Sequence, residues 1–247
     1  MNLPSHQRGW YVVKALVVVP TYNEAENVER LASEVLRLDN FDLLIVDDNS
    51  PDGTGQLAEA LKQRWNGRLD VLHRQGKQGL GTAYVAGFKV ALERGYDYIF
   101  EMDADFSHDP ADLPRLLAAA ETHQADIVLG SRYVAGGGTV NWPPLRRAIS
   151  RGGSLYARLI LGVPINDLTG GFKCFRREAL AKLDLDHVQA NGYSFQIEMT
   201  YRAWQRGLKV LEVPIVFVDR QVGQSKMSQR IVWEAMLLTW KLRLGLA

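Results

Sequence analysis

The chain has 247 residues, of which 47% are hydrophobic, and its 29 Lys plus Arg nearly balance its 28 Asp plus Glu. This length and composition are sufficient for one large α/β domain, and the balanced charge gives no reason to expect a nucleic-acid partner. The single cysteine, Cys174, excludes an internal disulfide, so we expect a buried thiol in a protein of a reducing compartment.

Neither a leader nor a membrane-spanning segment is expected from the sequence. The first twelve residues contain no apolar stretch like that of a secretory signal, and no segment has eighteen uninterrupted apolar residues. These features favour a cytoplasmic protein.

The first half of the chain alternates two kinds of pattern. Short runs rich in β-branched and aromatic residues predict strands at 14–20, 41–47, 69–73, 96–102 and 126–130. Apolar residues at helical spacing predict helices around 28–35, 57–61, 83–91 and 113–120. Strand and helix in alternation indicate an α/β fold with a mostly parallel sheet covered on both faces.

Beyond residue 130 the alternation weakens. The Gly- and Pro-rich segment 134–144 is either a mobile lid or a connector. The patterns that follow predict helices at 145–161 and 194–206, a strand at 172–175 and extended chain at 209–218. No linker divides the chain into separate globular domains.

Ligands of parallel sheets bind beyond the carboxyl ends of the strands, so the residues that directly follow strands are the candidates for function. The first strand runs into PTYNE (20–24) instead of a glycine fingerprint, which argues against a dinucleotide site. Tyr22 beside Glu24 suits stacking on a base and hydrogen bonding, although Thr21 and Asn23 also suit a helix cap. The second strand runs into DDNSPDGT (47–54), whose residue types are those of a turn and an N-cap, but one aspartate there can accept hydrogen bonds from a ribose or a base.

The fourth predicted strand ends in DADFSHDP (103–110). Asp103 and Asp105 are two residues apart, so in extended chain they project to the same side and repel each other. Carboxylate oxygens are the ligands that Mg²⁺ or Mn²⁺ prefers, and a cation shared with a diphosphate would remove this repulsion. The pair therefore predicts a divalent metal site that also stabilises a departing nucleoside diphosphate.

An ordered set of motifs spans about residues 16 to 226: VVVPTYNEAENV, IVDDNSPDGT, GLGTAYVAGF, MDADFSHDP, GSRY, DLTGGFKCF and GYSFQIEM. Together they resemble the inverting GT-A glycosyltransferases of family two, in particular the dolichol- or polyprenol-phosphate mannose synthases. The resemblance implies a GT-A (Rossmann-like) fold, a GDP-mannose donor, a Mg²⁺ or Mn²⁺ cofactor and a polyprenyl monophosphate acceptor.

The resemblance also implies roles for individual residues. The positions that match nucleotide-holding residues of the family are Pro20, Tyr22, Glu24, Val46 and Asp48. The positions that match its metal and diphosphate motif are Asp103, Ala104 and Asp105. Some relatives carry a glutamine where this chain has Ser107, so a metal contact at that position would run through water. The positions that match phosphate-binding basic residues are Arg132, Arg220 and Lys226.

Physical reasoning supports basic residues in this site. Two phosphorylated substrates must meet, and fixed cations offset their repulsion; Arg suits bidentate phosphate contacts and Lys acts as a point charge. Arg146, Arg147 and Arg151 are further candidates for the lipid phosphate, or else form a solvated helix face. Asp167 either anchors the glycine-rich loop or caps a turn.

The nature of the acceptor simplifies the predicted chemistry. A phosphate monoester is already anionic near neutral pH and can attack C1 of the sugar directly, so no general base is required. Catalysis would then rest on positioning and on stabilising the leaving group, with Asp103, Asp105 and Arg132 as the catalytic candidates and inversion from an α-linked donor to a β-linked product.

The segment 229–246 forms an amphipathic pattern in which Arg230, Glu234 and Lys241 occupy one narrow strip and apolar residues cover most of the rest. Its helix would lie at a membrane interface with Trp233 and Trp240 at headgroup depth, dock on a membrane-anchoring subunit, or pack on the core. The predicted division is an N-terminal arm (1–13), a GT-A domain (14–226) and an amphipathic C-terminal helix (227–247). The chain would then be peripheral on the inner face of a membrane, unless it is a catalytic domain cut from a larger polypeptide with a membrane domain of its own.

Three other functions remain compatible with the sequence. Motif spacing alone does not distinguish GDP-mannose from UDP-glucose, so a polyprenyl-phosphate glucosyltransferase is the nearest alternative. A noncatalytic nucleotide-sugar binding module is another, against which the DAD motif and the basic residues argue. A nucleotidyltransferase is the third.

Overall fold

The computed structural model describes residues 13–188, 192–219 and 229–246. For residues 229–233 it describes the backbone alone, and for Tyr193 likewise. The N-terminal arm up to residue 12 and the predicted phosphate-binding residues Arg220 and Lys226 lie outside the described residues. The proposed division into arm, domain and C-terminal helix therefore remains a prediction.

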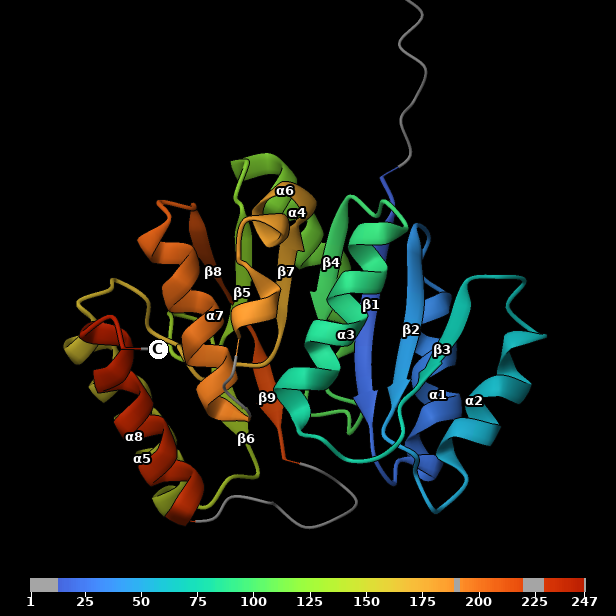
Figure 1. The fold of residues 1–247 in the computed structure, drawn as a ribbon, viewed down its shortest axis with the longest axis horizontal. Helices are drawn as coiled ribbons and strands as arrows, with labels where there is room; N and C mark the ends of the chain where they lie inside the picture. The colour runs from blue at the N-terminus through green and yellow to red at the C-terminus, as the bar shows by residue number, and fades with distance from the viewer. Residues whose placement is uncertain (1–12, 189–191, 220–228, 247) are drawn as a thin grey trace, which may run out of the picture.

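A seven-stranded sheet forms the centre of the molecule, with strand order β3-β2-β1-β4-β7-β5-β8 (Figure 1). Its strands are β1 (Ala15–Thr21), β2 (Phe41–Asp47), β3 (Leu69–His73), β4 (Tyr98–Glu101), β5 (Ile127–Ser131), β7 (Lys173–Arg176) and β8 (Val210–Pro214). β7 pairs antiparallel with both β4 and β5, whereas the other pairs in this sheet are parallel. The mostly parallel sheet predicted from the sequence is confirmed, and the antiparallel strand inside it is a feature that the pattern did not predict.

A second, two-stranded sheet lies in the glycine-rich segment. β6 (Gly138–Val140) pairs in parallel with β9 (Val216–Val218), the continuation of the extended chain predicted near the end of the domain. The segment 134–144 is thus more than an irregular connector in this structure, because its backbone is hydrogen-bonded to a strand far along the chain.

The helices occupy the predicted positions. They are α1 (Ala25–Leu36), α2 (Thr54–Lys62), α3 (Leu80–Glu93), α4 (Leu113–His123), α5 (Pro144–Leu161), α6 (Arg177–Ala181), α7 (Tyr193–Gln205) and α8 (Gln229–Arg243), with short 3-10 turns at Pro110–Asp112 and Leu185–His187. The short helix α6 and the 3-10 turns have too few residues to show a periodic pattern, and the sequence did not predict them.

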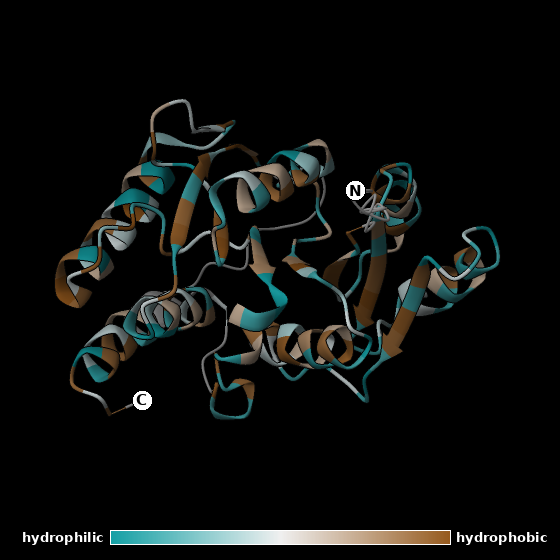
Figure 2. Cartoon of the chain, turned by 90° about the horizontal axis from the view of Figure 1, so that it is seen from above, coloured by the Kyte–Doolittle hydropathy of each residue, from teal (hydrophilic) through white to brown (hydrophobic). Residues whose placement is uncertain are grey.

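Two buried clusters cover the two faces of the central sheet. Apolar residues of α1, α2 and α4 pack on one face, and those of α3, α6 and α7 pack on the other. Consecutive strand residues alternate between the clusters, as Val17 and Val18 do, so both faces of the central strands are largely apolar. In Figure 2 brown predominates on the strands, whereas the helices are of mixed colour. Cys174 is buried in the first of these clusters, which confirms the expected core thiol.

Candidate active site

The ends of β1 and β2 are fastened to each other by Asp47, the last residue of β2. Its Oδ1 atom accepts hydrogen bonds from Thr21 Oγ1 at 3.0 Å and from Ser50 Oγ at 2.5 Å, and its Oδ2 atom accepts one from the Ser50 amide at 3.1 Å. Asp47 is 2% exposed. Its carboxylate therefore serves the turn, as expected for most of the DDNSPDGT cluster, and a ligand contact of Asp48 stays a prediction.

The loop that follows β1 is tied to the loop that follows β2. The amide of Asn23 donates to Ser50 Oγ at 3.1 Å, that of Glu24 to Thr54 Oγ1 at 2.9 Å, and that of Ala25 to an oxygen of Asp52 at 3.0 Å. Polar side chains of the second loop thus satisfy the exposed amides at the start of α1. Both loops contain asparagines with positive φ, Asn23 at 61° and Asn49 at 56°, a conformation that asparagine tolerates better than most residues.

Tyr22 and Asp48, two of the predicted nucleotide contacts, lie beside basic residues. The ammonium group of Lys77 lies 4.4 Å from the centre of the Tyr22 ring. An oxygen of Asp48 lies 2.9 Å from a guanidinium nitrogen of Arg74, and burial raises the pKa of this carboxyl although Arg74 acts in the opposite direction. A flat aromatic face beside a carboxylate and two cations is suited to a base attached to phosphates. Of the other nucleotide candidates, Pro20 and Val46 are register partners near the ends of β1 and β2. Glu24 directly precedes α1, and its Oε2 atom accepts a hydrogen bond of 2.8 Å from the side-chain amide of Asn27.

The two aspartates of the DAD motif follow β4 and differ in their surroundings. Asp103 is partly exposed, and its Oδ1 atom accepts a hydrogen bond of 3.2 Å from the hydroxyl of Tyr84 on α3. Asp105 is 7% exposed, and its Oδ1 atom accepts a hydrogen bond of 3.0 Å from the backbone amide of Ser107. Phe106, which lies between Asp105 and Ser107, adopts a left-handed conformation with φ of 58°. This conformation is uncommon for an aromatic residue and is typical of functional turns.

The oxygens at this turn fit a hard divalent cation. Beyond the two carboxylates, the hydroxyl of Ser107 is buried and has no hydrogen-bond partner among the described residues. The described part of the chain has no group of three or more His, Cys, Asp or Glu side chains that could enclose a metal. A cation here would therefore take only part of its shell from the protein and the rest from phosphates and water, which is the usual arrangement for Mg²⁺ in nucleotide sites.

His108 supports the DAD turn, a role that the sequence analysis missed. Its ring is stacked on Phe172, with centroids 5.0 Å apart, and meets the edge of Phe217 at 5.2 Å. Burial lowers the pKa of His108 to about 4, so the ring is neutral near pH 7. Its Nδ1 atom accepts a hydrogen bond of 3.4 Å from the backbone amide of Asp103. The signal was present in the motif SHDP, but a lone histidine does not reveal its partners.

Arg132 is held by Asp167 in a two-point ion pair. Its Nε atom donates to Oδ2 and its Nη2 atom to Oδ1 of the aspartate, both at 2.7 Å, and Nη2 also donates to Thr169 Oγ1 at 2.8 Å. The arginine is 5% exposed, and its charge lies near the rings of Tyr133, Trp142 and Phe217. Burial alone would raise the pKa of Asp167, but the charge and hydrogen bonds of Arg132 outweigh it and lower this pKa. Asp167 thus anchors Arg132, and a phosphate contact of Arg132 stays a prediction.

The three arginines predicted near the glycine-rich loop divide into two kinds. Arg146 donates to Asp219 at 2.6 Å and lies over the Trp142 ring at 4.4 Å, so it joins α5 to the end of β9. Arg147 and Arg151 are exposed on α5. The latter two have the freedom to meet an external anion, whereas Arg146 has a structural contact.

A comparison with known sequences places these features in a family. Residues 16–184 match the sequence profile of glycosyl transferase family 2. An undecaprenyl-phosphate mannosyltransferase of Micrococcus luteus is 48% identical over 226 residues, which cover 91% of this chain and 92% of the relative. A polyprenol monophosphomannose synthase of Mycolicibacterium smegmatis is 47% identical over 233 residues, which cover 93% and 88%. The resemblance inferred from the motifs is thereby confirmed.

Solved structures with the same fold are more distant in sequence. Glucosyl-3-phosphoglycerate synthase of Mycobacterium tuberculosis, in complex with Mn²⁺, UDP-glucose and glycerol 3-phosphate, matches 99% of this chain and 88% of its own with a TM-score of 0.69 and 18% identity. A mannosyltransferase of Pyrobaculum calidifontis, in complex with GDP-mannose and Mn²⁺, matches 96% and 74% with a TM-score of 0.57 and 17% identity. These likenesses confirm the predicted fold class.

Proposed function

The chain belongs to glycosyl transferase family 2 and shares nearly half of its residues with an undecaprenyl-phosphate mannosyltransferase and a polyprenol monophosphomannose synthase, so we propose that it transfers mannose from GDP-mannose to a polyprenyl monophosphate. The products are polyprenyl-phosphate mannose and GDP. The names of the M. luteus and M. smegmatis relatives support the lipid acceptor and the sugar, and the extent of their similarity covers most of this chain.

The arrangement at the end of β4 carries this proposal. Asp103 and Asp105 lie on one turn with the buried hydroxyl of Ser107, and this turn directly follows a strand paired with β1, which Tyr22 directly follows. We assign the divalent cation, Mg²⁺ or Mn²⁺, to these two aspartates. When bound, the cation would neutralise negative charge on the diphosphate. The structural neighbours that contain Mn²⁺ with a nucleotide sugar support this assignment.

The protein's own groups position the reactants. Tyr22 and Asp48 would hold the base and ribose, and the backbone of Ala104, whose side chain is buried in the apolar core, would lie beside the diphosphate. Arg132, Arg220 and Lys226 are the candidates for the phosphates. The acceptor phosphate attacks C1 as an anion, so His108, which is buried and neutral, is not needed as a base.

Transfer to lipid tests the proposed function directly. The protein would be incubated with a polyprenyl monophosphate, Mn²⁺ and either radiolabelled GDP-mannose or radiolabelled UDP-glucose, followed by extraction into organic solvent. We expect lipid-soluble label from GDP-mannose. If only UDP-glucose gave lipid-soluble label, the protein would be a glucosyltransferase in place of a mannosyltransferase. If neither donor gave label, the result would contradict an enzyme of this class.

We also propose that the protein works on a membrane surface at its cytoplasmic face and that α5 and α8 form the contact. No helix in the described ranges is long and apolar enough to cross a bilayer. The two helices lie side by side at one end of the molecule (Figure 1). Both expose large apolar side chains, namely Leu145, Ile149, Leu155 and Leu159 on α5 and Leu237 and Trp240 on α8, with exposed Leu244 directly after α8.

The pattern on α5 fits a lipid surface with acidic headgroups. At 100° per residue its four exposed apolar residues fall within an arc of roughly 120°, opposite the face that buries Ala157 and Leu161. Arg151 lies about 40° beyond one edge of this arc, and Arg147 lies about 40° further on, toward the buried face. An apolar stripe with an adjacent basic strip is the pattern of a helix that lies in a membrane interface. We therefore extend to α5 the role that the sequence suggested for the C-terminal helix alone.

A further inference from the structure

A buried ion pair lies behind the DAD motif. Lys173 on β7 and Glu101 on β4 are register partners in the antiparallel pair, and neither side chain is exposed. The Lys173 ammonium donates to Glu101 Oε1 at 2.6 Å, to the carbonyl oxygen of Gly170 at 2.8 Å and to Oε1 of Gln196. An ammonium group has three donors, so Lys173 joins three separate elements: β4, the turn before β7, and α7.

Stability alone is a poor reason to bury these charges. Removing a carboxylate and an ammonium from water costs several kcal/mol per ion, and well-packed apolar residues often replace such a pair without loss. Burial lowers the pKa of Lys173 and raises that of Glu101, while the attraction between the two acts against both shifts. The Lys173–Glu101 pair is therefore better explained by how it positions the residues that it contacts.

The turn that Lys173 holds lies between Gln196 and the first aspartate of the DAD motif. A Cβ atom on Gly171 would lie 3.3 Å from Nε2 of Gln196 and 3.9 Å from Oδ2 of Asp103. This turn lies against Asp167 as well, because a Cβ atom on Gly170 would lie 3.4 Å from the Asp167 carboxyl carbon. The Gly170–Gly171 backbone thus borders both the aspartate proposed for the cation and the aspartate that anchors Arg132.

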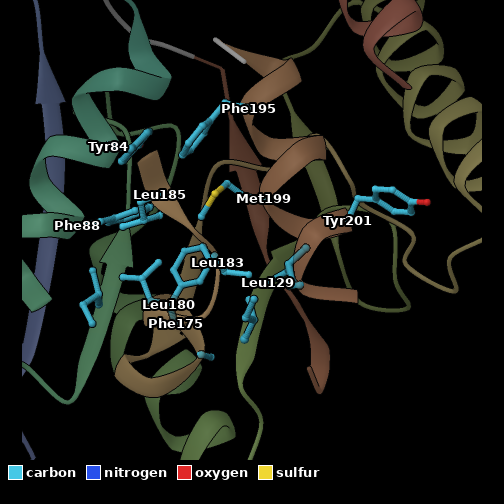
Figure 3. Packing of buried hydrophobic residues seen from close by; sticks show 14 of the residues in the cluster. Tyr84, Phe88, Leu129, Phe175, Leu180, Leu183, Leu185, Phe195, Met199 and Tyr201 are labelled. Atoms are coloured by element: carbon cyan, nitrogen blue, oxygen red, sulfur yellow. The ribbon is translucent and has the colours of Figure 1, made fainter. Parts of the chain in front are cut away.

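Tyr84 on α3 and Phe195 on α7 also help to hold Asp103 in place. The Tyr84 hydroxyl donates to Oδ1 of Asp103, and the Tyr84 ring is stacked on Phe195, with centroids 5.7 Å apart, directly before Gln196 on α7. Figure 3 shows the rings of Tyr84 and Phe195 facing each other between α3 and α7. Burial raises the pKa of Tyr84, and the charges of Asp103, Glu101 and Asp105 add to this effect, so all three carboxylates lie near its hydroxyl.

We propose that Lys173, with Glu101 and Gln196, is a positioning network for the cation site. It holds the Gly170–Gly171 turn against Asp103 and so fixes the orientation of the carboxylate that receives the divalent cation. The cation at Asp103 comes from the proposed function, on which this inference rests. Partners that orient metal ligands from behind typically change metal affinity by about 10–100-fold when they are removed.

Two variants test the network while keeping the fold. Lys173→Met alone would leave Glu101 as a buried charge without its partner, so it is combined with Glu101→Gln, which removes both charges together. Gln196→Ala leaves the ion pair intact and removes only one contact of the ammonium. The matched control is Glu198→Gln on the same helix, because Glu198 accepts a hydrogen bond of 2.8 Å from Arg202 and is equally buried.

The measurement is the Kd of Mn²⁺ in the presence of GDP, followed by electron paramagnetic resonance, together with denaturant unfolding of each protein. We expect the double variant to bind Mn²⁺ about 10–100-fold more weakly, Gln196→Ala to lie between it and wild type, and the control to bind as wild type does. In transfer assays the Mn²⁺ concentration for half-maximal rate should rise in the same order, while kcat at saturating Mn²⁺ changes much less.

Contrary results separate this inference from the proposed function. Wild-type Mn²⁺ affinity in a folded double variant, with or without a loss of stability, would reduce the network to a structural ion pair and overturn the inference. Failure of the wild-type protein to bind Mn²⁺ with GDP would instead overturn the assignment of the cation to Asp103 and Asp105, and with it the premise of this test.

Discussion

Gly87 on α3 lies directly against Val18 on β1. A Cβ atom at position 87 would come within 2.3 Å of Cγ1 of Val18 and 3.2 Å of Cγ2 of Val46. The absence of a side chain thus allows the helix to approach the sheet closely. This approach matters for the site, because Tyr84 stands one turn earlier on the same helix and reaches Asp103 from there.

Gly87→Ala should therefore destabilise the protein, by about 1–3 kcal/mol for an overpacked core. Gly152→Ala is the matched control, since Gly152 is also inside a helix and a Cβ atom there meets nothing within 4 Å. That control should raise stability by up to about 1 kcal/mol through helix propensity. Denaturant unfolding of both variants measures the difference, and equal effects would contradict the close contact.

Tyr84→Phe should weaken cation binding through the loss of the hydrogen bond to Asp103. We expect a Kd for Mn²⁺ with GDP about threefold to tenfold higher than in wild type, equivalent to about 1 kcal/mol, which is part of the roughly 1.5–3 kcal/mol that a hydrogen bond to a charged group contributes. Tyr96→Phe is the control, because Tyr96 donates to Asp42 at 2.8 Å, outside the DAD turn. Isothermal titration of both variants would test this, and equal Mn²⁺ affinities would argue against a role for the Tyr84 hydroxyl.

Asp105→Ala should abolish metal-dependent transfer while the protein stays folded. A metal ion is worth several kcal/mol of charge stabilisation, so the rate should fall by at least about 100-fold. Asp109→Ala, at an exposed aspartate of the same motif, should retain most of the activity. The measurement is label transferred to lipid, with circular dichroism as the check on folding. Retained wild-type activity in the presence of a strong chelator would refute the metal role.

The ion pair of Asp167 and Arg132 predicts a specific dependence on pH. The pKa of Asp167 is lower in the folded protein than in the unfolded chain, so its contribution to stability is present above about pH 4 and is lost as pH falls through the folded-state pKa. Asp167→Asn leaves Arg132 buried without its charge partner and should cost about 3–5 kcal/mol at neutral pH.

The measurement for this pair is unfolding free energy at neutral pH and at successively lower pH. The difference between wild type and Asp167→Asn should narrow as the solution becomes more acidic than about pH 4. Glu34→Gln, which removes the exposed pair with Arg30, should change stability by less than about 1 kcal/mol. A constant difference across the acidic range would show that the charge of Asp167 is not what stabilises the fold.

Membrane association should depend on α5 as well as on α8. Leu145 and Leu159 are 72% and 70% exposed. Replacing both with Gln should reduce binding to liposomes that contain acidic lipid by at least about tenfold. The reason is that burying one leucine side chain contributes about 1.5–3 kcal/mol. Trp204→Gln removes an exposed aromatic residue of α7 and should leave binding unchanged. Flotation measures this, and unchanged binding of the double variant would restrict the contact to α8 or to another surface.

Much of the fold could be predicted because its signals are local. The strands and helices up to residue 131 follow from runs of apolar residues at characteristic spacing, and the parallel arrangement follows from their alternation. The DAD motif was assigned to the end of β4 for the same reason. The predicted segments match the observed elements to within a few residues at each end.

The remaining features depend on partners far apart in the sequence. β7 runs antiparallel between β4 and β5, and four residues of strand carry no information about direction. Arg132 was predicted as a phosphate ligand from its motif, but its two-point bond with Asp167 involves residues 35 positions apart. Lys173 looked like an ordinary strand residue, because only the folded sheet brings it to Glu101.

The position of β7 has a consequence for how the protein is made. β4 and β5 are consecutive strands of the chain, yet they cannot pair with each other in the finished sheet, because the strand between them is supplied more than forty residues later. A nascent chain that ends at β5 therefore lacks the strand that separates β4 from β5 in the finished sheet, which leaves a slot between them. Closing that slot requires a long loop to return, and the insertion of β7 also delivers the Gly170–Gly171 turn to Asp103, before β8 is available to pair with β5.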